Sequence, residues 1–280
     1  MNAAPPAPDE LDALVRLLDD ETPAVRNRVA ERLALSNGDL SEWLATRLRP
    51  LSKQEKNLLS ELLRPPHRAT LIREWIAPTG GAAALQEDWE TFESLLRTLS
   101  DFLHDGISLR QPLSDALDLL AEEASDEGIS TANELRSFLF DGTRLTANPE
   151  KFSDPRNSDL AWCIAEGHSN PLGLSLIFML VGRRLQLEIE GVNFPGHFLC
   201  RIFEDGFPVI IDCHDNGRLH LQHTLLESPE LNRAQRDFLR RSADPGAILK
   251  RLLTNLHGAL EQAARDEDAA LVAKLQATLG

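Results

Sequence analysis

The sequence predicts an α+β fold in which helices at both ends of the chain surround one small antiparallel sheet. Three observations predict it. Apolar residues recur at helical spacing as far as about residue 185. Over residues 187–212 the period shortens towards two, as it does in short strands. Helical spacing then returns from residue 222 onwards.

The N-terminal helical region is expected over residues 10–80, after an Ala/Pro-rich flexible tail at 1–9. Pro23 follows Thr22, which suits the first turn of a helix. Further helices are expected at 40–48, 52–63 and 68–77. Because residues 17–26 are similar to the hinge of a HEAT repeat, this domain is interpreted as HEAT-like. An irregular helical bundle is the alternative.

The segment Pro78-Thr79-Gly80-Gly81 is the best domain boundary. Helices are predicted beyond it at 87–104, 112–124, 131–140, 158–166 and 171–185. The last of these has a strong start, with Asn170 as the N-cap and Pro171 at the first helical position.

The sheet is predicted to contain three strands and an edge strand. Residues 187–192 alternate apolar and polar side chains, and residues 198–203 form a second strand. Asp205-Gly206 predicts a tight hairpin turn into residues 209–212, which are mostly apolar and therefore central. Residues 219–221 resemble an edge strand. The sheet is expected to pack on helix 171–185.

The C-terminal extension, residues 226–280, is expected to be helical. Asp244-Pro245 opens a helix to about Ala264, and a partner helix runs from Asp266 to Leu279. The pair resembles one unit of a helical-repeat array, so it is interpreted as a partial repeat.

Composition restricts the partners. The formal net charge is −15, which disfavours nucleic acid and anionic membrane because both require a positive patch. The chain has three cysteines, an odd number without a disulfide or zinc spacing, and no secretory leader is recognisable. A cytoplasmic protein without cofactor or metal is expected, and its partners are expected to be proteins.

Two polar residues stand out in the sheet. His197 follows Pro195-Gly196 at the start of the second strand, and Asp212 ends a hydrophobic strand, where a carboxylate is costly unless it is paired. If the two strands are hairpin neighbours, Asp212 can hold the His197 ring in one tautomer, as in a catalytic triad. A buried structural pair is the alternative.

The expected nucleophile is missing. A helix N-terminus activates a thiol, but Asn170-Pro171 supplies none there. Cys163 is either a displaced nucleophile or a core residue, and Cys200 and Cys213 are expected to be packing residues. The segment Cys213-His214-Asp215, with His220 and His223, contains metal-ligand types, but its spacing matches no zinc motif.

Residues 85–225 resemble the SirB-type transglutaminase-like proteins of bacteria. The resemblance is carried most specifically by Asn170-Pro171-x-x-Leu174-Ser175 and by Pro195-Gly196-His197-Phe198. Residues 135–140, 154–158 and 211–212 add to it.

The resemblance implies a fold related to transglutaminases and papain-like thiol enzymes. Aligned through Arg183 and Leu185, the family's cysteine position falls on Pro171, and its His and Asp positions fall on His197 and Asp212. The sequence therefore predicts a non-catalytic module that acts as a protein-binding or regulatory adaptor. A hydrolase or transamidase that uses the His197-Asp212 dyad without a cysteine is the alternative.

Overall fold

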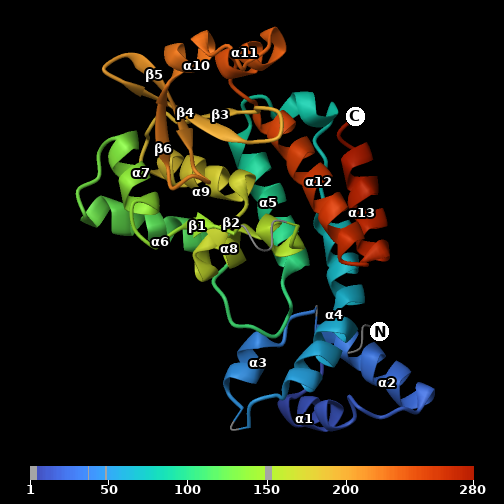
Figure 1. Ribbon diagram of the computed structural model, residues 1–280. Coiled ribbons are helices and arrows are strands. Elements are labelled where there is room, and N and C mark those ends of the chain that lie inside the picture. Colours follow the sequence, from blue (N-terminus) through green and yellow to red (C-terminus); the bar gives the residue numbers. More distant parts are fainter. Residues whose placement is uncertain (1–4, 37, 48, 149–152) are drawn as a thin grey trace. The chain divides into compact units, whose positions relative to one another are not determined.

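The computed structural model describes residues 5–36, 38–47, 49–148 and 153–280 (Figure 1). The chain forms two compact units. Unit 1 consists of Met1–Ile76 with Asp101–Arg110, and unit 2 consists of Ala77–Ser100 with Gln111–Gly280. The expected division into segments 1–9, 10–80, 85–225 and 226–280 stays a prediction.

Unit 1 is helical and has its own apolar core. Its helices are α1 (Pro8–Arg16), α2 (Pro23–Leu33), η1 (Ala34–Ser36), α3 (Ser41–Ala45) and α4 (Lys53–Glu74). Helix α1 begins inside the predicted tail, of which residues 1–4 lie outside the described part of the chain. The core is formed by Leu11, Leu14, Val15, Leu18, Val29, Leu33, Leu40, Leu59 and Leu63.

Helix α4 corrects one prediction. The helices expected at 52–63 and 68–77 are a single helix that continues through Pro65 and Pro66. A proline inside a helix removes one backbone hydrogen bond. Here the apolar face outweighs that loss, because Leu63 and Leu71 on either side of the prolines are both buried. Ser52 closes the N-terminus with a capping box.

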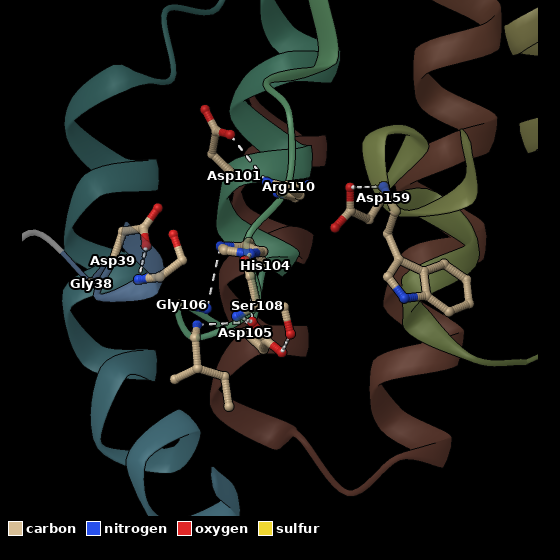
Figure 2. Close-up of polar contacts among 12 residues, drawn as sticks. Gly38, Asp39, Asp101, His104, Asp105, Gly106, Ser108, Arg110 and Asp159 are labelled. Carbon is tan, nitrogen blue, oxygen red and sulfur yellow. Dashed lines mark hydrogen bonds and ion pairs between the residues drawn. The ribbon is translucent and has the colours of Figure 1, made fainter. Parts of the chain in front are cut away.

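The excursion Asp101–Arg110 into unit 1 is held by its own polar contacts (Figure 2). Asp105 accepts the N–H groups of Ile107 at 2.9 Å and Ser108 at 2.8 Å. His104 accepts the Gly106 N–H at Nδ1, so its Nε2 carries the proton and donates to the Ser108 carbonyl at 2.8 Å. The loop is therefore a defined turn.

Unit 2 contains most of the helices. These are η2 (Gly81–Leu85), α5 (Trp89–Leu103, whose last residues belong to unit 1), α6 (Leu113–Asp126), α7 (Ala132–Phe140), η3 (Pro155–Ser158), α8 (Leu160–Glu166), α9 (Pro171–Arg184), α10 (Gln222–Glu227), α11 (Arg233–Arg240), α12 (Pro245–Gln262) and α13 (Asp266–Ala277). A short parallel pair joins β1 (Thr146–Ala147) to β2 (His168–Ser169). Helices α10 and α11 were not separately predicted.

The main sheet is antiparallel, with strand order β3-β4-β5-β6. The strands are β3 (Glu190–Val192), β4 (Leu199–Glu204), β5 (Phe207–Asp212) and β6 (Arg218–Leu221). Asp205 and Gly206 both have positive φ, at 49° and 81°, as a tight two-residue hairpin requires. The predicted hairpin, the inner position of β5 and the edge position of β6 are confirmed.

Strand β3 is shorter than the predicted strand 187–192. The reason lies at the end of α9, where Gln186 has a φ of 58° and the Leu187 N–H donates to the Gly182 carbonyl at 2.8 Å. The Gln186 N–H bonds the Arg183 carbonyl at 3.1 Å, which completes a Schellman motif. Residue 187 thus finishes the helix and is not free to begin the strand.

Helices cover both faces of the sheet (Figure 1). Helix α9, buried from Pro171 to Gly182, packs on the face of Cys200, whose Sγ lies 3.8 Å from the Ser175 carbonyl oxygen. Helices α10 and α11 cover the other face, where Leu239 packs with Val192 and Ile210. The sheet is therefore an inner layer, which fits the prediction that it packs on helix 171–185.

The first and last segments of unit 2 are hydrogen-bonded to each other. The Ala82 N–H donates to the carbonyl of Leu279 at 2.9 Å. Gly246, in the first turn of α12, lies so close to this segment that an added Cβ would stand 2.0 Å from the Ala82 carbonyl oxygen. Helices α12 and α13 thus belong to the same unit as the sheet.

Candidate functional site

The structure brings His197 and Asp212 together. In the β4–β5 ladder Cys200 pairs with Ile211, and His197 precedes β4 in a bend that follows Gly196. The expectation that His197 is the first residue of the strand is wrong, because the strand begins at Leu199. The Nε2 of His197 lies 2.7 Å from Oδ1 of Asp212.

The pair is accessible from one side. The His197 side chain is 30% exposed and that of Asp212 is 20% exposed. An ionised carboxylate only accepts hydrogen bonds, so Nε2 of His197 carries the proton in this contact. Its Nδ1 contacts no hydrogen-bonding partner in the described part of the chain and is available as a proton acceptor.

Asp212 is held by three donors. Besides His197, the backbone N–H groups of His214 and Asp215 donate to its Oδ1 at 3.0 and 3.1 Å. Burial alone would raise the pKa of Asp212, but the hydrogen bond from His197, the charge that this ring carries when protonated and the two N–H groups outweigh it, so its pKa lies below the ordinary value. The carboxylate is therefore ionised at neutral pH.

His214, for which the sequence indicated no catalytic role, lies beside His197. The His214 and His197 rings meet edge to face, with centroids 5.8 Å apart. Burial and the nearby charge of His197 lower the pKa of His214 below its ordinary value. His214 is consequently neutral at neutral pH.

The loop that presents His197 is anchored from α12. Arg251 Nη1 donates to the Asn193 side-chain oxygen at 2.5 Å and to the Phe194 carbonyl at 2.8 Å. The same carbonyl accepts the His197 backbone N–H at 3.2 Å. The Arg251 guanidinium also lies 5.5 Å from the centre of the Phe198 ring. No local sequence signal links Arg251 to this loop, because 57 residues separate it from Phe194.

The start of α9 is built as predicted. The Asn170 side chain accepts the Gly173 N–H at 2.9 Å, and Pro171 is the first helical residue. Both side chains are buried. Neither is a nucleophile, so the helix end where a thiol would be activated holds a cap and a proline.

All three thiols are in the core. Cys163 is fully buried, its Sγ lies 3.1 Å from Ser169 Oγ, and burial raises its pKa far above the ordinary value. Burial likewise raises the pKa of Cys213, which lies 3.9 Å from Cys200. A buried neutral thiol is a poor nucleophile, so this environment disfavours Cys163 as a displaced nucleophile. Among the residues described, no three His, Cys, Asp or Glu side chains are grouped to hold a metal ion.

Comparison with known proteins identifies the class. A family model described as the transglutaminase-like superfamily matches residues 108–254, just over half of the chain. The match contains α9, the whole sheet and both His197 and Asp212. The chain belongs to the transglutaminase-like superfamily, and it is a mixed helix-and-sheet protein with a domain of that class.

The names of the similar curated proteins state no activity. The chain is similar to the UPF0162 protein of Xylella fastidiosa strain Temecula1, with 33% identity over 133 residues, or 43% of this chain and 45% of that protein. It is also 34% identical over 122 residues to a UPF0162 protein of Pseudomonas aeruginosa, covering 42% of this chain and 43% of the relative. The aligned region thus spans less than half the length of either relative.

No solved structure matches the chain. In the described ranges, no helix has the length and apolar character needed to cross a bilayer.

Proposed function

We propose that the chain is a SirB-type, non-catalytic transglutaminase-like module that acts as a protein-binding or regulatory adaptor. The observation that carries this proposal is Pro171 at the first position of α9, where the fold would present a nucleophile. The buried state of Cys163, Cys200 and Cys213 supports it, since none of these thiols replaces the missing group.

The flanking helices support the adaptor role. We propose that residues 10–80 are a HEAT-like domain, 85–225 the transglutaminase-like domain and 226–280 a partial helical repeat. The packing of α12 against α13 is consistent with one repeat pair. Helical repeats bind proteins through extended surfaces. Because a net charge of −15 disfavours nucleic acid and anionic membrane, the proposed partners are cytoplasmic proteins, and no cofactor is required.

Activity assays on the purified protein test this function. Wild type and Pro171→Cys are incubated with a glutamine-bearing acyl donor and a primary amine as the acyl acceptor, and with amide and ester substrates for hydrolysis. We expect no turnover by wild type. In cells, Pro171→Cys should leave the phenotype unchanged. A phenotype confined to His197→Ala at equal protein level would contradict the proposal.

A second candidate function is favoured by the accessible His197-Asp212 contact. His197 Nδ1 could activate water towards an amide, with Asp212 fixing the tautomer. The Leu172 N–H, the first backbone donor of α9, could stabilise the oxyanion that forms. This is the hydrolase or transamidase that works without a cysteine.

The residues on which turnover depends distinguish the two functions. Wild-type turnover that is lost equally in His197→Ala and Asp212→Asn supports the enzyme. Turnover that instead depends on Cys163 supports a displaced thiol and excludes the water mechanism.

A further inference from the structure

A charged groove lies on unit 2, on a side of α9 that the candidate pair does not use. Helix α5, helix α6 and the C-terminal end of α9 line it, and its volume is about 630 Å³. Three arginines contribute to the lining, namely Arg97, Arg183 and Arg184. Three carboxylates also line it, so the groove carries charges of both signs.

Arg184 forms ion pairs within unit 2. Its Nη2 lies 2.6 Å from Glu93 Oε1, and its Nε lies 2.5 Å from Asp118 Oδ1. These contacts join the end of α9 to α5 and α6. Because two carboxylates balance this guanidinium, Arg184 braces the groove and does not attract a ligand.

The other two arginines form no ion pair with a described residue. The Arg183 guanidinium lies 4.5 Å from the centre of the Trp89 ring, and no hydrogen bond joins it to a described residue. Arg97 makes no hydrogen bond or ion pair with the residues that the structure describes. Both residues are exposed. Two guanidinium groups therefore offer unused donors to one groove, and stacking on Trp89 restrains one of them.

The groove also holds an exposed negative charge. Glu90 belongs to the lining, and its carboxylate has no partner within the described ranges. Glu90 and Arg97 are seven residues apart on α5, which places them on one helix face about 10 Å apart along the axis. A densely charged anion would be repelled by Glu90, whereas a ligand with charges of both signs fits the lining.

We propose that this groove binds an extended peptide segment of a protein partner, with a carboxylate on Arg97 and Arg183 and a basic side chain on Glu90. An extended chain in the polyproline II conformation has three residues per turn and advances about 9 Å over them, so two charges three residues apart lie on one face at this spacing. The proposal rests on the proposed adaptor function, for which it names a binding surface. It is independent of His197 and Asp212.

The test uses the full-length chain and a fluorescein-labelled alanine peptide with one Glu and, three residues later, one Lys. Fluorescence anisotropy measures the Kd in buffer of low ionic strength. We expect saturable binding that Arg97→Gln and Arg183→Gln each weaken about three- to fivefold, as for exposed charge pairs. Arg233→Gln is the matched control, because Arg233 is an exposed arginine of unit 2 outside the groove and should leave the Kd unchanged.

Removing the two charges one at a time tests the contact between the peptide Lys and Glu90. Replacing the peptide Lys by Ala should weaken binding to wild type, and Glu90→Gln should then have no further effect. Circular dichroism verifies that each variant is folded.

Three results overturn the proposal. The first is no binding by wild type up to about 1 mM peptide. The second is an affinity in both arginine variants that equals that of wild type. The third is displacement of the peptide by inorganic phosphate together with no effect of replacing its Lys, which would indicate a simple anion site. Failure of the adaptor function has a different signature, namely substrate turnover that depends on His197 and not on Arg97.

Discussion

The carboxylate of Asp212 accepts three hydrogen bonds, one from the His197 ring and two from backbone N–H groups. Removing it leaves the His197 ring and two backbone donors without their acceptor. We therefore expect Asp212→Ala to lower the free energy of unfolding by about 1–3 kcal/mol, and His197→Ala by less. Thermal and denaturant unfolding measure both. Asp215→Ala, an exposed neighbour, is the control.

The alternative role of the pair predicts the opposite result. Functional groups are often not optimised for stability, so a catalytic dyad should tolerate His197→Ala with a change near zero or a gain. That outcome would contradict the structural role and favour the enzyme.

The depressed pKa of Asp212 makes stability depend on pH. Because its pKa is lower in the folded chain than the ordinary 3.8, its stabilising contribution is complete above that value and is lost as the pH falls through the folded pKa. The stability difference between wild type and Asp212→Asn should therefore shrink from about pH 5 towards about pH 2. Unfolding in guanidinium at several pH values measures it, and a difference that stays constant would show that Asp212 does not titrate in this way.

At the scale of elements, the loop before β4 depends on α12. Arg251 donates to Asn193 and Phe194, and Phe194 accepts the His197 N–H. We expect Arg251→Gln to lower the free energy of unfolding by about 1–2 kcal/mol. Amide hydrogen exchange should accelerate at His197. Lys250→Gln, one residue away, is the matched control, and equal exchange in the two variants would argue against the anchor.

The end of α9 offers a stabilising substitution. Gln186 adopts a left-handed backbone with φ of 58°, which glycine adopts without a Cβ penalty. Gln186 is exposed, so its side chain contributes little packing. Gln186→Gly should raise the free energy of unfolding by about 0.5–1 kcal/mol, measured by thermal unfolding. Glu188→Gly, outside the motif, should give no such gain.

Local chemistry explains which elements could be predicted. Asn170-Pro171 places the start of α9 correctly because a cap and a first-turn proline act within four residues. The Asp205-Gly206 turn likewise fixes the β4–β5 hairpin, and with it the approach of His197 to Asp212.

The predictions that failed also have physical causes. Pro65-Pro66 suggested a break that tertiary packing overrides, and strand 187–192 was too long because a polar, non-glycine residue ends α9 in a left-handed conformation. The contact of Arg251 with Phe194 could not be predicted, since no rule of spacing joins a helix residue to a loop 57 residues earlier.

For the whole molecule, charge repulsion is the dominant long-range contribution to stability. A net charge of −15 produces self-repulsion in the compact state, which salt screens with a Debye length of about 10 Å at 0.1 M. We expect the midpoint of thermal unfolding to rise as sodium chloride increases from about 0.02 to 0.2 M. A falling midpoint would mean that the ion pairs within the units outweigh the repulsion.

The hydrogen bond between Ala82 and Leu279 has a consequence for synthesis. Domains fold as units while the chain leaves the ribosome, and this unit pairs a segment made early with one made almost two hundred residues later. The η2 segment must wait for α12 and α13 before its partners exist. Until then the sheet lacks the Arg251 anchor, so the nascent chain passes through a long interval in which chaperones can bind it.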